Sequence, residues 1–148
     1  MRNRKVVIID DDRKSLGYLE EILAASGYDS VLVSDALLAV DIVVQRNPDA
    51  ILLDLEMPSK NGFELANEIN HIFETQRIPI IAMSSLLKNS PFPLMSFCRI
   101  NRYLKKPFNP LDVIWALENV IEENHQSEKE IYSESVEYKN YDIAGRSF

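Results

Sequence analysis

The chain of 148 residues contains one cysteine, one tryptophan and four glycines, and it has no long uninterrupted apolar segment. Its single cysteine, Cys98, excludes a framework of intrachain disulfides and fits a reducing compartment. No stretch approaches the roughly 18 consecutive apolar residues that a transmembrane helix needs. Residues 1–5 lead directly into four apolar residues and then into acids, so the apolar core of a secretory signal is missing. We therefore expect a cytoplasmic protein with no membrane partner.

Positive charge is also in short supply. The chain has 16 lysines and arginines against 23 aspartates and glutamates, which gives a formal net charge of -7. This balance argues against nonspecific binding to nucleic acid, so we expect no nucleic-acid partner. The hydrophobic share of 46% and the charged share of 26% are ordinary for a soluble globular protein of one domain.

Strand-like and helix-like patterns alternate five times along the chain. The expected strands cover residues 5–9, 28–33, 50–53, 78–83 and 101–105. The expected helices cover residues 13–26, 35–46, 63–74, 91–98 and 110–123. Such alternation is typical of a parallel sheet with helices on both faces, so the sequence predicts a doubly wound α/β fold.

The fourth helix and the C-terminal residues follow the pattern less well. Pro91 and Pro93 fit a helix only in its first turn, with Ser90 as the N-cap. That helix is apolar on almost all sides, so it is either sunk into the domain or covered by a partner or by the tail. Residues 125–148 show no clear periodicity yet contain several large apolar side chains. We therefore expect a domain over residues 1–123, followed by a tail, an extension or a linker.

Polar side chains stand at the ends of four expected strands. Asp10 and Asp11 follow the first strand, Asp54 the third, Ser84 the fourth and Lys106 the last. The carboxyl ends of parallel strands open on one edge of the sheet, where ligands bind in α/β folds. We therefore expect three carboxylates, one hydroxyl and one ammonium group to converge there.

These groups suit a hard cation and a phosphoryl group. Carboxylate oxygens are the ligands that Mg²⁺ or Mn²⁺ prefers, and without a cation the crowded charges should raise the pKa of at least one carboxyl. Ser84 and Lys106 provide the donors that hold phosphoryl oxygens, and Asp54 is a competent nucleophile toward phosphorus. Each residue alone has an ordinary structural explanation, but their joint placement at four strand ends favours a site.

Three motifs make residues 4 to about 123 resemble the receiver domain of two-component response regulators, the CheY-like superfamily. Residues 6–12 look like the first strand with its acidic pair, and residues 103–108 look like the last strand with its lysine-proline-phenylalanine. Residues 51–58 with Gly62 look like the phosphorylation loop, and Ser84 falls where the family has a threonine or serine. The resemblance implies a flavodoxin-like fold of five parallel strands in the order 2-1-3-4-5 with five helices.

The resemblance also implies roles for single residues. Asp54 would be the phosphoacceptor, and Lys106 would contact the phosphoryl group. Asp11, Asp54 and the backbone carbonyl of Glu56 would bind Mg²⁺ directly, with Asp10 acting through a water. The bond between Lys106 and Pro107 would be cis, as it is in the family.

A switch and a set of partners follow from the same resemblance. Ser84 would move toward the phosphoryl oxygen and Tyr103 would turn inward, changing the surface of the last two helices and the last strand. The phosphodonor would be a sensor histidine kinase or a histidine phosphotransfer protein, since His71 and His125 have ordinary structural explanations. The receiver would signal to a downstream protein and would not be an enzyme beyond its own phosphorylation and dephosphorylation.

The sequence departs from the family at two places. Residues 99–101 replace the usual glycine-alanine-acid turn. Glu56 is long and acidic for a position beside the path of the hydrolytic water, so we expect it to alter the lifetime of the aspartyl phosphate.

Alternatives to a stand-alone receiver stay open at this point. The chain could be a receiver cut from a longer regulator or hybrid kinase, in which residues 124–148 are a linker. A phosphohydrolase with an aspartyl nucleophile would use the same groups, although no lid or substrate pocket is indicated. A scaffold independent of phosphorylation is disfavoured because all the expected site groups are present.

Overall fold

The computed structural model describes residues 2–85 and 96–139, with backbone alone for residues 134–139. The predicted helix over residues 91–98 falls mostly outside the described residues. The same holds for the end of the chain, residues 140–148.

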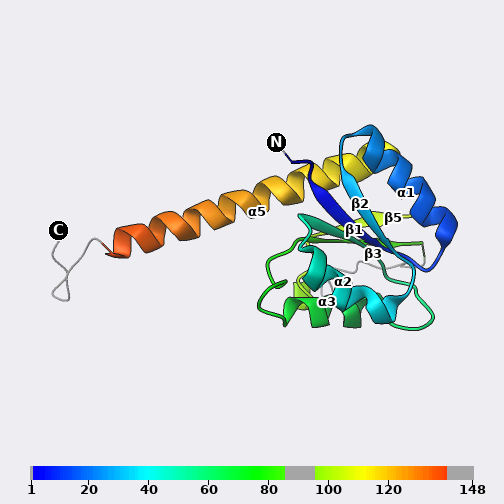
Figure 1. Cartoon of the computed structure of the whole chain (residues 1–148), viewed down its shortest axis with the longest axis horizontal. Helices are drawn as coiled ribbons and strands as arrows, with labels where there is room; N and C mark the ends of the chain where they lie inside the picture. Colours follow the sequence, from blue (N-terminus) through cyan, green and yellow to red (C-terminus); the bar gives the residue numbers. More distant parts are fainter. Residues whose placement is uncertain (1, 86–95, 140–148) are drawn as a thin grey trace.

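Five parallel strands form one sheet, as predicted (Figure 1). They are β1 (Lys5–Ile9), β2 (Asp29–Val33), β3 (Ala50–Asp54), β4 (Ile80–Ser84) and β5 (Arg102–Lys105). The strand order is β2-β1-β3-β4-β5, so the predicted order is confirmed and each predicted boundary holds to within two residues. All five residues of β3 and of β4 are buried, which matches the continuous apolar runs of central parallel strands.

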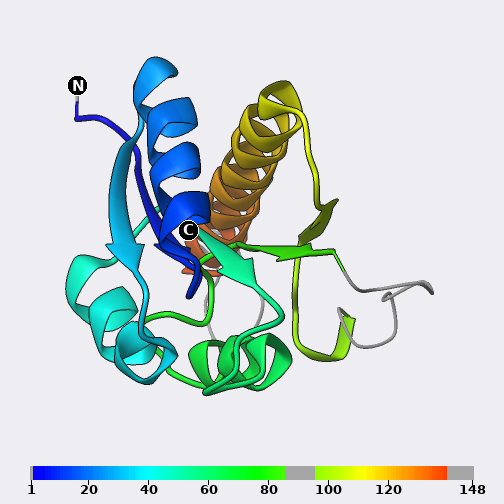
Figure 2. The same cartoon turned by 90° about the vertical axis from the view of Figure 1, so that its right-hand side faces the viewer.

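Helices cover both faces of the sheet (Figure 2). They are α1 (Arg13–Ala25), the 3₁₀ turn η1 (Ala36–Leu38), α2 (Ala39–Arg46), α3 (Gly62–Asn70) and α5 (Pro110–Lys139). Buried side chains of α1 and α5 share one core cluster, and those of α2 and α3 share the other. The described residues therefore contain four of the five predicted α-helices, arranged as a doubly wound fold.

Two predicted helices have different limits in the structure. The helix expected over residues 35–46 begins as η1, and the side chain of Asp35 caps this turn by accepting from the backbone N–H of Leu37 at 2.9 Å. The helix expected over residues 63–74 ends at Asn70. Beyond it, the hydroxyl of Thr75 donates to the carbonyl of Ile69 at 2.7 Å, a side-chain bond that replaces the next helical turn.

The last helix is much longer than predicted. It was expected to end at residue 123, but α5 runs on to Lys139 and projects away from the sheet (Figure 1). Among the described side chains of this helix, the last that is buried is Ile121, and residues 125–133 are exposed. These distal turns contain no proline or glycine, so local helix propensity continues where packing has ended. Among the described residues, no helix combines the length and the apolar character needed to cross a membrane.

Gly62 brings the start of α3 against the chain that follows Asp54. A Cβ atom at this position would lie 2.6 Å from the Leu55 Cα and 2.7 Å from the Asp54 carbonyl oxygen. Backbone atoms cannot move aside as a flexible side chain can, so Gly62→Ala is expected to lower the free energy of unfolding by about 1–3 kcal/mol. Urea unfolding measures this loss.

Gly17 provides the control for this substitution. A Cβ atom there would meet nothing within 4 Å, and the residue lies inside α1. Gly17→Ala should therefore stabilise the protein by about 0.5–1 kcal/mol. Equal effects of the two substitutions would contradict the packing argument.

Candidate functional site

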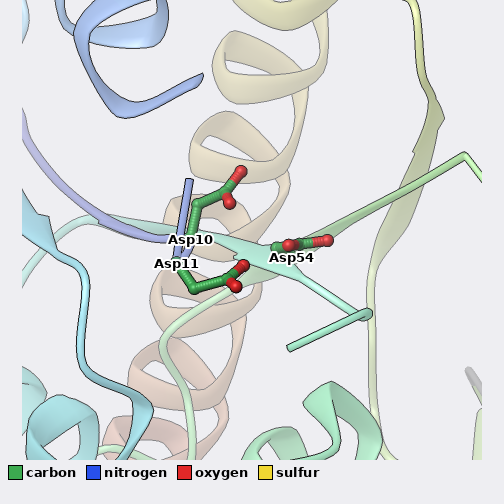
Figure 3. Close-up of side chains that lie close together, drawn as sticks. All are labelled: Asp10, Asp11 and Asp54. Atoms are coloured by element: carbon green, nitrogen blue, oxygen red, sulfur yellow. The ribbon is translucent and has the colours of Figure 1, made fainter. Parts of the chain in front are cut away.

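Four strand ends bring their polar residues to one edge of the sheet. Asp10 follows β1, Asp54 ends β3, Ser84 ends β4, and Lys106 follows β5. Carboxylate oxygens of Asp10, Asp11 and Asp54 all lie within 4.8 Å of one another, and Figure 3 shows the three side chains gathered at this edge. The sheet thus assembles the groups that the sequence predicted would converge.

The three consecutive acids after β1 have different surroundings. Asp10 is fully buried, and its Oδ1 accepts from the backbone N–H of Asp12 at 2.9 Å. Asp11 is exposed. Asp12 caps α1 by accepting from the backbone N–H of Lys14 at 3.0 Å, and this bond, with a second from the Ser15 hydroxyl, lowers the pKa of Asp12. Only Asp10 and Asp11 therefore face the site.

Lys106 is the cation of the site. Its Nζ lies 3.1 Å from Asp10 Oδ2 and 3.6 Å from Asp54 Oδ1. Burial by itself lowers the pKa of Lys106, but the charges of Asp10 and Asp54 outweigh it and the net pKa is raised. The following peptide bond to Pro107 is cis, as the resemblance implied. Lys106 therefore stays charged and is fixed between two carboxylates.

The surroundings of Asp54 disfavour its ionised form. It is 4% exposed, and its pKa is raised to about 7, first by burial and then by the charge of Asp10. Lys106 and the backbone N–H of Glu56, which donates to Asp54 Oδ1 at 3.2 Å, oppose the shift without cancelling it. The expectation that one of the crowded carboxyls has a raised pKa is confirmed.

Ser84 lies between Glu56 and Tyr103. The fully buried Ser84 donates its hydroxyl hydrogen to Glu56 Oε1. The hydroxyl of Tyr103 donates to the backbone carbonyl of Ser84 at 3.3 Å, and the Tyr103 ring packs half-buried against the core cluster under α2 and α3. Sequence reasoning gave Glu56 a role through its backbone carbonyl and an effect of its side chain on the lifetime of the aspartyl phosphate, but it missed this contact with Ser84.

The donor set fits a hard divalent cation. Three carboxylates offer oxygens within one small volume, and these are the ligands Mg²⁺ takes in proteins. Burial and then the charge of Asp10 raise the pKa of Asp54, and Lys106 does not cancel the shift, so a bound cation would favour the ionised carboxylate. Asp10, Asp11 and Asp54 are thus suited to share a cation.

Comparison with known proteins decides the family. The model of the response regulator receiver domain matches residues 6–118, which is most of the chain. The chain belongs to the response regulator receiver domain family. In this receiver domain α5 extends beyond the matched part.

Solved structures of other receivers share the fold. The receiver domain of a sensor histidine kinase from Pseudomonas aeruginosa, described with a magnesium ion coordinated in the active site cleft, is 27% identical with a TM-score of 0.74; the match covers 80% of this chain and 98% of that one. A CheY-like receiver from Methanospirillum hungatei is 19% identical with a TM-score of 0.78, covering 84% and 98%. A putative response regulator from Chloroflexus aurantiacus is 24% identical with a TM-score of 0.75, covering 80% and 98%. The last two structures are less than one quarter identical to this chain, so they show only that the fold is shared.

Proposed function

We propose that this receiver accepts a phosphoryl group on Asp54 from a phosphohistidine of a sensor histidine kinase or a histidine phosphotransfer protein. The observation that carries the proposal is the meeting of Asp54, Lys106 and Ser84 at three strand ends, with Lys106 Nζ 3.6 Å from Asp54 Oδ1. A nucleophile, a fixed cation and a hydroxyl donor are the groups that phosphoryl transfer to a carboxylate requires.

Each residue has a defined part in the transfer. A carboxylate oxygen of Asp54 attacks phosphorus, the bond from phosphorus to the donor's imidazole nitrogen breaks, and that nitrogen keeps the electron pair. Lys106 balances negative charge on the phosphoryl oxygens, and Asp10, 3.1 Å from its Nζ, holds the ammonium in place. The Ser84 hydroxyl donates to a phosphoryl oxygen once it leaves Glu56.

A divalent cation completes the proposed site. Asp10, Asp11, Asp54 and the backbone carbonyl of Glu56 would hold Mg²⁺ or Mn²⁺, with Asp10 acting through a water. When bound, the cation would neutralise charge on the phosphoryl oxygens. The magnesium described in the Pseudomonas aeruginosa receiver supports this assignment.

The output of the proposed switch runs through β4 and β5. Movement of Ser84 toward the phosphoryl group would shift the backbone carbonyl to which Tyr103 donates. Tyr103 would then repack inward and alter the surface of β5, α5 and the segment between β4 and β5, which a downstream protein would read. The receiver acts as a signalling phosphoacceptor and not as an enzyme on other substrates. We expect it to act in the cytoplasm. We also expect its packed domain to end near residue 123, within α5.

Intact mass measurement tests the phosphoacceptor assignment. In Mg²⁺ and acetyl phosphate, the protein should gain the mass of one phosphoryl group, and Asp54→Asn should gain none. Asp41→Asn removes an exposed acid from the first turn of α2 and should leave the gain unchanged. Absence of the gain under conditions that modify another receiver, or its persistence in Asp54→Asn, would refute the assignment.

A further inference from the structure

Glu56 lies where a phosphoryl group on Asp54 would be held. Its backbone N–H donates to Asp54 Oδ1 at 3.2 Å, and its Oε1 accepts the hydroxyl hydrogen of Ser84. The loop after β3 therefore binds the phosphoacceptor through its backbone and the switch hydroxyl through its side chain.

The charge of Glu56 also acts on Lys106. Glu56 is among the carboxylates whose negative charge raises the pKa of Lys106, after Asp10 and Asp54. Its carboxylate thus engages Ser84 by a hydrogen bond and Lys106 through space. Ser84 and Lys106 are the two side chains that the proposed function assigns to the phosphoryl oxygens.

We propose that Glu56 is a built-in competitor of the phosphoryl group for the Ser84 hydroxyl, and that it biases the switch toward its unphosphorylated state. The proposal rests on the proposed function and adds a regulator of the same site. Glu56 is a positioning residue here, because it acts through Ser84 and not on the transferred group.

The competition follows from the properties of the two anions. A fully buried hydroxyl with one hydrogen donates strongly to one acceptor at a time, and both candidate acceptors are negatively charged. The phosphoryl group also repels the carboxylate, so Glu56 has to leave the Ser84 hydroxyl as the phosphoryl group takes it. Glu56 is partly exposed as a residue, but its Oε2 is buried and its Oε1 is bonded to Ser84, so the carboxylate has to turn away from Ser84 before the phosphoryl group can take the hydroxyl. Phosphorylation therefore moves the switch only after breaking a charge-assisted hydrogen bond.

Beryllofluoride, a stable mimic of a phosphoryl group on a carboxylate, tests the competition by calorimetry at saturating Mg²⁺. Glu56→Ala should bind beryllofluoride about tenfold more tightly than the wild type, since a hydrogen bond to a charged acceptor no longer has to be broken. Glu56→Gln keeps an acceptor oxygen without the charge and should fall between the two. Glu64→Ala removes an exposed acid from the first turn of α3. It should change the affinity by less than about twofold, because solvent and salt screen an exposed charge.

A double-substitution cycle separates competition for Ser84 from general repulsion. In a Ser84→Ala background, Glu56→Ala should change beryllofluoride affinity by no more than about twofold, because the contested hydroxyl is gone. An equal gain in both backgrounds, or no gain in the wild-type background, would overturn the proposal. Thermal melts of each variant establish that it is folded before binding is compared.

Failure of the proposed function gives a different result. If the wild type does not bind beryllofluoride with Mg²⁺, or if Asp54→Asn binds it equally well, the phosphoacceptor assignment fails and the competition fails with it. If binding depends on Asp54 but is indifferent to Glu56, the phosphoacceptor assignment stands and the competition alone is refuted.

Discussion

Asp54→Asn is expected to raise the free energy of unfolding of the metal-free protein at pH 8 by on the order of 2–4 kcal/mol, or about 10 °C in melting temperature. The pKa of Asp54 in the fold is about 7, against an ordinary value of 3.8 for an aspartate in water. Between these values the folded protein binds one proton more than the unfolded chain, so the Asp54 contribution to stability falls as pH rises from about 4 to about 7. Asparagine has nearly the same shape and carries no charge, so it removes this loss.

Urea unfolding in EDTA at pH 4.5 and at pH 8 measures the effect. At pH 4.5 most of the difference between Asp54→Asn and the wild type should vanish, because folded Asp54 is then protonated. Asp41→Asn, the exposed control on α2, should stay within about 0.5 kcal/mol of the wild type at both values. Mg²⁺ at 100 times its dissociation constant should stabilise the wild type by about 2.7 kcal/mol and Asp54→Asn by less. Equal stabilities at pH 8 would contradict the burial of an unbalanced charge.

The sheet could be predicted because each buried strand is also a continuous apolar run that stops at a polar residue. Residues 80–83 and 50–53 are examples, and both strands are buried along their full length. Alternation with helices then restricts the topology to a parallel sheet. The strand order came from the family resemblance, and the structure confirms it.

The length of α5 could not be predicted from apolar periodicity. Periodicity reports the face of a helix that packs, and in the part of this helix whose side chains are described the last buried residue is Ile121. The turns from His125 to Lys139 are helical through local propensity, without the packing of an apolar face over residues 125–133. The residue at which the apolar stripe stops therefore predicts where the helix stops packing, but it does not predict where the helix ends.

In the candidate site, too, some features could be predicted from the sequence and others could not. Asp10, Asp54 and Lys106 could be placed together because each lies at a strand end, where the sheet dictates position. The contact of Glu56 with Ser84 could not, because the direction of a loop side chain depends on the loop's own path. That path is fixed by the close approach of Gly62 to Leu55, which no periodicity encodes. The sequence therefore predicts which residues belong to the site more readily than it predicts the contacts between them.

Lys106→Ala is expected to weaken beryllofluoride binding at saturating Mg²⁺ by about 100-fold, which is about 2.7 kcal/mol. The ammonium lies 3.6 Å from Asp54 Oδ1 and is held there by Asp10, so it is already placed for a group attached to Asp54. A hydrogen bond to a charged group contributes about 1.5–3 kcal/mol, and a group placed before binding loses little freedom on making it. Titration calorimetry measures the affinity.

Lys105→Ala is the matched control for this loss. Lys105 is the last residue of β5 and is exposed, and successive side chains of a strand point to opposite sides, so its charge lies near the site without entering it. Its removal should change the affinity by no more than about twofold, because a solvent-exposed charge is screened. A loss in Lys106→Ala no larger than that in Lys105→Ala would reduce Lys106 to a counter-ion for Asp10. A loss confined to Lys106→Ala would instead mean that the same ammonium balances Asp10 and Asp54 before phosphorylation and binds the phosphoryl group after it.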